Sequence, residues 1–181
     1  MEEIVFNEYK QVNEVKKSKE FLEEKLGVRI TITGPKIVFE GPPMKEYESS
    51  LVFEAIAHGF SAKKAVQLKS HEYVFRRLII KDFTRRKNLK DVKSRIIGTE
   101  GKTRRTLENL SDCDILITES AVGIIANADN IDEATTAVQN LIRGSKQANV
   151  YKYLEKRNVQ RRQRDTDLGI KDKKLKANSN L

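Results

Sequence analysis

Hydrophobic and polar residues alternate in the same way at two places in this chain. Isoleucine occupies every second position over residues 29–33 (RITIT) and again over 114–118 (DILIT), which is typical of a strand with one buried face. The offset that takes residue 29 to residue 114 also takes 22–23 to 107–108 and 54–59 to 139–144, without a gap. The sequence therefore predicts an internal repeat of one fold with this constant offset.

The first unit of the repeat reads as a helix, two short strands and a second helix. The predicted elements are a helix over about residues 10–26, strands over 28–33 and 36–40, and a helix over 44–58. Pro42 and Pro43 mark the entry to the second helix, and Gly59 closes it.

The second unit repeats this order. Its predicted helices span about residues 102–110 and 131–143, and its strands span 114–118 and 122–126. Asp129 or Asn130 is the expected N-cap of the later helix, because a short polar side chain there accepts hydrogen bonds from the first turn.

Two segments lie outside the repeat. Between the units, residues 62–68 predict a short helix and residues 73–82 alternate like a strand, and we expect the domain boundary in this stretch. After Gly144, a helix starts near Val150, loses its pattern near Arg161 and leads into a polar, mobile end. The chain is thus expected to be an α+β protein with domains over residues 1–70 and 71–155 and a basic helical tail over 156–181.

The excess of positive charge lies in the second part of the chain. Of the net charge of +9, residues 1–70 contribute nothing, with 11 Lys and Arg against 11 acids, while residues 71–181 hold 24 against 15. This excess favours a polyanionic partner. The sequence also has no apolar run long enough to cross a membrane, an acidic N-terminus and a single cysteine, so we expect a cytoplasmic protein without membrane contact.

The basic unit carries a glycine loop that the first unit lacks. Residues 95–97 lead into Gly98-Thr99-Glu100-Gly101, the glycine loop, and a helix begins directly after it. Glycine lets a backbone approach a sugar-phosphate chain closely, and the N–H groups at a helix start attract phosphate. The offset of the repeat puts residues 13–16 at this position in the first unit, within a helix predicted to be unbroken. We therefore predict a phosphate-binding loop at a strand-to-helix junction of the second unit.

The predicted RNA-binding residues surround the glycine loop. Neighbouring cations add charge-assisted contacts to phosphate, and isoleucines in a groove between the loop helix and the next strand hold unpaired bases. These residues are Lys93, Arg95, Ile96, Ile97, Gly98, Thr99, Glu100, Gly101, Lys102, Arg104, Arg105, Ile115 and Ile117. The acid at Glu100 is expected to weaken the attraction of phosphate and to leave more of the affinity to the cations.

Residues 95–105, with the sequence RIIGTEGKTRR, resemble the KH signature of the archaeal partner-of-Nob (dimethylase-interacting) ribosome-assembly proteins. Residues 54–65 resemble the link after the family's first KH unit, and residues 141–145 and 150–155 resemble its C-terminal segment. The resemblance covers about residues 1–160 and implies two tandem type I KH domains, each with the order βααββα. The first is expected to be degenerate, because it lacks the glycine turn that the family usually keeps.

The resemblance also implies a function and partners. It implies a non-catalytic protein of small-subunit assembly that binds single-stranded RNA near the 3′ end of the small-subunit ribosomal RNA and assists its processing. The implied partners are a Nob-type endonuclease, the pre-ribosomal small subunit and, in archaea, the alpha subunit of translation initiation factor two.

The residues alone leave alternatives open. A protein-interaction scaffold with secondary contact to RNA or single-stranded DNA agrees with the missing first loop and with Glu100. An enzyme is disfavoured, because His58 and His71 do not have the spacing of a metal-ligand set, and no cofactor is expected. The basic run over residues 157–164 is either an extension that contacts RNA or a solvated helix end.

Overall fold

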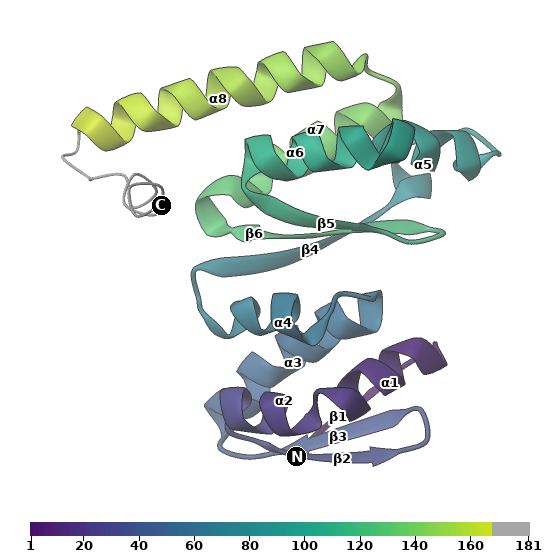
Figure 1. Cartoon of the computed structure of the whole chain (residues 1–181), viewed down its shortest axis with the longest axis vertical. Coiled ribbons are helices and arrows are strands. Elements are labelled where there is room, and N and C mark those ends of the chain that lie inside the picture. Colours follow the sequence, from purple (N-terminus) through teal and green to yellow (C-terminus); the bar gives the residue numbers. More distant parts are fainter. Residues whose placement is uncertain (168–181) are drawn as a thin grey trace.

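The computed structural model describes residues 1–167 and stacks two three-stranded sheets with layers of helices (Figure 1). The first unit comprises β1 (Glu2–Val5), α1 (Tyr9–Lys17), α2 (Lys19–Leu26), β2 (Arg29–Thr33), β3 (Lys36–Glu40), α3 (Pro43–His58) and α4 (Ala62–Ala65), followed by a 3-10 turn (Val66–Lys69). The second unit comprises β4 (Tyr73–Ile79), a 3-10 turn (Ile80–Asp82), α5 (Leu89–Ile97), α6 (Lys102–Ser111), β5 (Cys113–Ile117), β6 (Ala121–Asn127), α7 (Ala128–Arg143) and α8 (Gln147–Asp167).

Both sheets are antiparallel and share one topology. The strand orders are β1-β3-β2 and β4-β6-β5, so that the last strand of each unit lies in the centre of its sheet. Each unit therefore has the order βααββα. The predicted α+β fold with a tandem repeat is confirmed.

The repeat extends to individual hydrogen bonds. Glu23 Oε1 accepts from the backbone N–H of Ile30 at 2.7 Å, and Glu108 Oε1 accepts from that of Ile115 at 3.0 Å. Both pairs obey the constant offset of the repeat. In each unit this carboxylate ties the helix to the start of the edge strand.

The constant offset fails before the second helix of each unit, because the units connect their first two helices differently. Helices α1 and α5 are equally long, yet only Ser18 separates α1 from α2, whereas the glycine loop separates α5 from α6. The predicted unbroken helix over residues 10–26 is wrong, because Ser18 leaves the helical conformation with φ −106° and ψ 13°. The break lets Val15 and Leu22, both fully buried, face the same core. The first unit is degenerate because its loop is shortened, rather than because other residues fill it.

The second sheet is buried on both faces. Strand β6 has six consecutive buried residues, of which Ile124 belongs to the core of the second unit and Ile125 to the core of the first. Figure 1 shows the reason: α5, α6 and α7 cover one face of this sheet, and α3 and α4 of the first unit lie against the other. An ion pair between Lys64 and Asp114 also joins the units. The two units therefore pack as one body.

Two helix ends differ from the sequence prediction. The N-cap of α7 is Asn127, whose side chain accepts from the N–H of Asp129 at 3.0 Å, so the predicted caps Asp129 and Asn130 are wrong. Helix α8 does not end near Arg161 but continues to Asp167. Asn158 donates to the carbonyl of Leu110 at 2.7 Å and links the helix to α6. Residues 168–181 of the predicted tail lie outside the described residues.

Candidate nucleic-acid interface

The glycine loop connects two helices, so the predicted strand-to-helix junction is wrong. Residues 89–97 form α5. Asn88 is its N-cap, and the side chain of Asn88 accepts from the N–H of Lys90 at 3.0 Å. Val92 and Ile96 are the buried residues of α5 and lie one helical turn apart. Ser94, halfway between them, is exposed, whereas a strand would place all three side chains on one face, so the burial pattern is helical.

Gly98 allows the glycine loop to fold back onto α6. Its N–H donates to the carbonyl of Ser94 at 2.8 Å, and its backbone has φ 73° and ψ 174°, a region that only glycine adopts readily. A Cβ atom at this position would lie 2.1 Å from Oγ1 of Thr103 and 2.7 Å from its backbone nitrogen. The close approach to Thr103 therefore requires glycine.

The other end of the loop is open. Glu100 and Gly101 are both left-handed, with φ 51° and φ 75°, and a Cβ atom at Gly101 would meet nothing within 4 Å. The guanidinium of Arg105 donates to the carbonyl of Glu100 at 2.7 Å, which holds this non-glycine residue in its unusual conformation. Thr99 and Glu100 are exposed at the tip. The loop thus presents its backbone and the side chains of Thr99 and Glu100 to a ligand.

Helix α8 supports the base of the glycine loop. Gln147, at the start of α8, donates to Thr103 Oγ1 at 2.8 Å and to the carbonyl of Arg95 at 3.2 Å. One amide thereby joins the end of α5 to the first turn of α6. The sequence contained no signal for this role of Gln147, because both partners are far from it along the chain.

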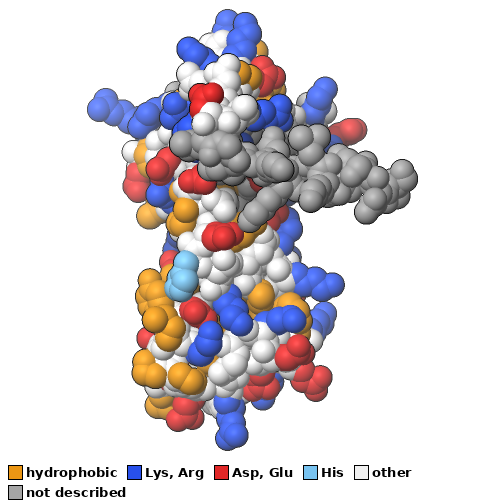
Figure 2. Space-filling view, turned by 90° about the vertical axis from the view of Figure 1, so that its left-hand side faces the viewer, with side chains coloured by type: hydrophobic (Ala, Val, Ile, Leu, Met, Phe, Trp, Pro, Cys, Tyr) orange, Lys and Arg blue, Asp and Glu red, His pale blue; other side chains and the backbone are white. Residues whose placement is uncertain are grey.

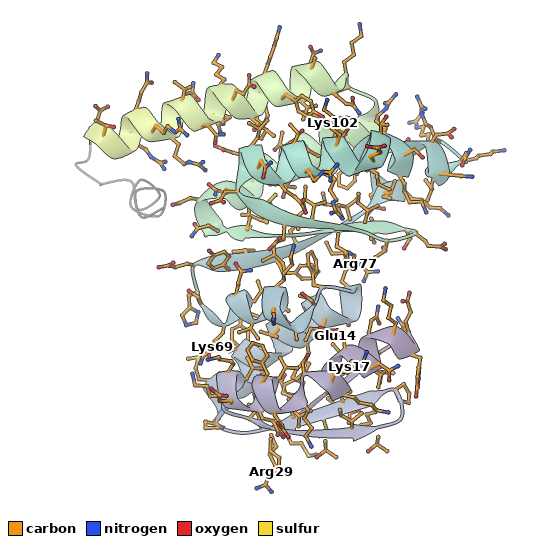
Figure 3. All side chains as sticks on the ribbon, in the orientation of Figure 1. Glu14, Lys17, Arg29, Lys69, Arg77 and Lys102 are labelled. Atoms are coloured by element: carbon orange, nitrogen blue, oxygen red, sulfur yellow. The ribbon has the colours of Figure 1, made fainter. Side chains whose placement is uncertain are left out.

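The predicted cations divide into free and engaged side chains. Among the described residues, Lys93, Arg95 and Lys102 have no ion-pair partner, whereas Arg104 lies 3.6 Å from Glu108. Figure 3 shows Lys102 in the helical layer of the second unit, remote from Glu14 and Lys17 of the first. Free cations near the loop can neutralise phosphate without first breaking a pair.

The predicted isoleucines do not all reach the surface. Ile96 and Ile115 are 0% and 3% exposed and belong to the core of the second unit, so neither can touch a base in this conformation. Ile97 is 39% exposed, and Ile117 is half-buried. Of the four predicted isoleucines, Ile97 and Ile117 are therefore the two with accessible side chains.

Within residues 1–167, His58 and Cys113 lie outside any cluster that could hold a metal. These residues contain no group of three His, Cys, Asp or Glu side chains that could hold a metal, and none of their helices is long and apolar enough to cross a membrane. Burial lowers the pKa of His58; the backbone of Leu116 opposes this shift, and the charge of Arg77 adds to it. Burial, with the neighbouring acids, raises the pKa of Cys113 to about 12. At neutral pH, His58 is uncharged and Cys113 is a thiol.

Known proteins share this fold. Residues 74–159 match the model of the second KH domain of PNO1, described as a eukaryotic type KH-domain (KH-domain type I). The structure also superposes on Dim2p from Pyrococcus horikoshii OT3 with a TM-score of 0.75 and 27% identity, over 86% of this chain and 99% of that one. This chain is similar to the PNO1/Dim2 KH proteins. The resemblance stated from residues 95–105 is confirmed, as is the tandem type I KH fold.

Two further solved structures are similar to this KH protein. A protein from Aeropyrum pernix has a TM-score of 0.81 and 27% identity over 94% of this chain and 98% of its own. A chain of the a/eIF2alpha-aDim2p-rRNA complex of P. horikoshii OT3 matches with a TM-score of 0.75 and 26% identity, over 86% of this chain and 92% of that one.

Curated relatives match over shorter parts of their length. A KH domain-containing protein of Methanocaldococcus jannaschii is 31% identical over 145 residues, which are 76% of this chain and 64% of the relative. The RNA-binding protein PNO1 of Oryzias latipes is 40% identical over 57 residues, which are 32% of this chain and 24% of the relative. The chain therefore spans less than two thirds of the length of these two relatives.

Proposed function

We propose that this KH protein binds single-stranded RNA during assembly of the small ribosomal subunit and catalyses no reaction itself. The observation that supports the proposal is the glycine loop, with its open left-handed end at Gly101 and free cations beside it. The rRNA in the complex of the similar aDim2p agrees with it.

Phosphates bind at the glycine loop and at the cations around it. Backbone N–H groups at the tip and the start of α6 donate to phosphate oxygens, and Lys93, Arg95, Lys102 and Arg105 supply charge. Arg104 contributes less, because Glu108 already neutralises it. Bases pack on Ile97 and Ile117 between α5 and β5, which requires them to be unpaired.

The target and partners follow from the family. We assign the 3′ end of the small-subunit ribosomal RNA as the target and a Nob-type endonuclease as the enzyme that this protein assists. The a/eIF2alpha in the complex of the similar aDim2p supports the alpha subunit of translation initiation factor two as a further partner.

A single substitution tests RNA binding without disturbing the fold. Gly101→Asp places a negative charge at an open position, so we expect the affinity for a single-stranded RNA of the small-subunit 3′ end to fall about tenfold or more. A double substitution of Gly98 and Gly101 is unsuitable, because a side chain at Gly98 would clash with Thr103. Fluorescence anisotropy at fixed salt measures the affinity.

Gly34 provides the matched control. It has φ 62°, close to that of Gly101, and a Cβ atom there also meets nothing within 4 Å, but it lies in the first unit. Gly34→Asp should therefore leave the RNA affinity unchanged. Equal affinities of the Gly101→Asp and Gly34→Asp variants would contradict the proposal.

A protein-docking role for the first unit is the second candidate. Large apolar side chains are exposed there, among them Tyr9 at 73%, Met44 at 59% and Tyr47 at 55%. Figure 2 shows hydrophobic side chains gathered on the lower part of the molecule, while Lys and Arg surround its upper end. Binding of the purified endonuclease without RNA, lost on Tyr9→Ser, would support this role.

A further inference from the structure

Gln147 is the first residue of α8 and lies beside the base of the glycine loop. Its amide nitrogen donates to Oγ1 of Thr103 at 2.8 Å and to the carbonyl of Arg95 at 3.2 Å. That carbonyl belongs to the last turn of α5, where carbonyl groups have no partner within the helix. One uncharged side chain therefore completes the end of α5 and holds the start of α6.

The bond to Thr103 acts on the glycine loop itself. Thr103 is 3% exposed, and the loop begins by packing against it, since a Cβ atom at Gly98 would lie 2.7 Å from Cβ of Thr103. A shift of Thr103 would therefore move the first residue of the loop. Gln147 fixes the side chain on which this contact depends.

The start of α8 is a rigid platform for Gln147. Val150 and Leu154, on the same helix, are 2% and 1% exposed and belong to the core of the second unit. The turn before α8 is also fixed, because the N–H groups of Gly144 and Ser145 donate to the carbonyl of Asn140 at 3.1 and 2.9 Å. Figure 1 shows α8 running along α6 from the end of the unit that carries the glycine loop. A side chain on a packed helix can hold a neighbouring loop in one conformation.

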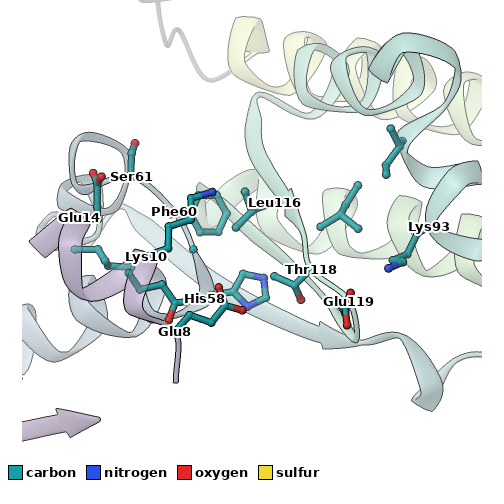
Figure 4. A pocket seen from close by; sticks show the side chains of 15 residues that line it. Glu8, Lys10, Glu14, His58, Phe60, Ser61, Lys93, Leu116, Thr118 and Glu119 are labelled. Atoms are coloured by element: carbon teal, nitrogen blue, oxygen red, sulfur yellow. The ribbon is translucent and has the colours of Figure 1, made fainter. Parts of the chain in front are cut away.

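The first unit contains the same platform without the glutamine. The constant offset of the repeat pairs Gln147 with Ala62, which is the first residue of α4. In the first unit Glu14 of α1 lies near Ser61 (Figure 4), and its Oε1 accepts from the backbone N–H of Ala62 at 2.9 Å. Alanine offers no side-chain donor to the helices of that unit. The glutamine thus occurs in the unit that has the glycine loop, and alanine occurs in the unit that lacks it.

Gln147 lies outside the groove in which the bases pack. The pocket of about 560 Å³ along this groove is lined by Lys93, Ile97 and Ile117, and its lining does not include Gln147. A glutamine amide has two N–H donors, and those of Gln147 serve two acceptors within the protein. An effect of Gln147 on RNA binding must therefore pass through its two protein partners.

We infer that Gln147 is a positioning residue for RNA binding: it holds Thr103 and the end of α5 so that the glycine loop keeps the conformation that binds phosphate. The inference rests on the proposed function. The affinity of a protein for its ligand is proportional to the fraction of molecules in the binding conformation. Loss of the amide lowers this fraction, and hence the affinity, without removing a contact to RNA.

The first test is Gln147→Met, which keeps the length of the side chain and removes both hydrogen bonds. The affinity for a single-stranded RNA of the small-subunit 3′ end, measured by fluorescence anisotropy well below the Tm, should fall about fivefold or more. Gln163→Met makes the same replacement at an exposed position of α8 and should leave the affinity unchanged.

A second pair of variants shows whether the effect passes through Thr103. Thr103→Val removes the hydroxyl from a side chain that is too buried to touch RNA, and it should also weaken binding. Thr103→Ser keeps the hydroxyl and should restore the affinity that Thr103→Val loses. Because Gln147→Met and Thr103→Val break the same bond, the double variant should bind no more weakly than Gln147→Met alone.

Three results would overturn the inference. They are an unchanged affinity in Gln147→Met or Thr103→Val, even with a lower Tm; an equal loss in Gln163→Met; and losses that add in full in the double variant. If Gly101→Asp still weakens binding in these cases, RNA binding at the glycine loop stands. If Gly101→Asp binds RNA as tightly as the unmodified protein does, the proposed function fails, and the inference fails with it.

Discussion

The two glycines of the loop should respond very differently to the same substitution. Alanine at Gly98 introduces a Cβ atom 2.1 Å from Thr103 Oγ1 and 2.7 Å from Thr103 Cβ. Thr103 cannot withdraw freely, since it is 3% exposed and hydrogen-bonded to Gln147. Alanine at Gly101 meets no atom within 4 Å.

The magnitudes follow from the two environments. At Gly98, alanine would be held in a backbone region that side chains disfavour, which destabilises the protein by about 1–3 kcal/mol. Overpacking against Thr103 destabilises it by about 1–3 kcal/mol more. At Gly101, the left-handed conformation contributes about 1–2 kcal/mol, of which the lower entropy of the unfolded alanine chain offsets about 0.4–1 kcal/mol. We expect Gly98→Ala to lower the free energy of unfolding by about 3–5 kcal/mol, and Gly101→Ala by about 1 kcal/mol.

Urea unfolding followed by circular dichroism measures both values. Gly98→Ala should shift the midpoint strongly to lower urea, and Gly101→Ala only slightly. If the two variants differ by less than about 1 kcal/mol, the close approach of Gly98 to Thr103 is not a constraint on the loop, and the reasoning from its geometry is refuted.

Three further predictions concern the loop, the contact between the units and pH. Glu100→Lys should tighten RNA binding and add contact with about one phosphate, so the slope of log affinity against log salt concentration should steepen by roughly 0.7. Glu24→Lys, in the first unit, should change neither. Gly123→Leu should destabilise the protein by about 2 kcal/mol or more, because a Cβ atom there lies 2.4 Å from the His58 ring; a heat-denaturation midpoint that stays in place would contradict this. Because the pKa of His58 is lowered in the folded state, the unfolded state binds its proton more readily, so stability should be full above pH about 6.5 and fall below it toward the lowered pKa. This pH dependence should persist in His71→Gln and weaken in His58→Leu.

The local pattern was sufficient for features that depend on neighbouring residues. Alternating isoleucines located β2 and β5, and glycines at the ends of α3 and α7 located their termini. The glycine loop was visible as well, because its two glycines and the basic helix start are contiguous. The excess of charge in the second unit follows from counting alone.

The same local reasoning failed where a choice depended on distant contacts. Whether residues 89–97 form a helix depends on Val92 and Ile96 facing the second core, and the break at Ser18 depends on how α1 and α2 share the first core. Burial of Ile96 and Ile115 removed two predicted base contacts for the same reason.

The sequence by itself thus determined the repeat, the strands and the position of the glycine loop, since each is encoded in a few adjacent residues. Only the tertiary structure decided which side chains surround that loop. Gln147 supports it through hydrogen bonds to Thr103 and to the carbonyl of Arg95 from a distant part of the chain. Such contacts depend on how α8 packs against the rest of the second unit, and packing between distant segments leaves no periodic signal in the chain.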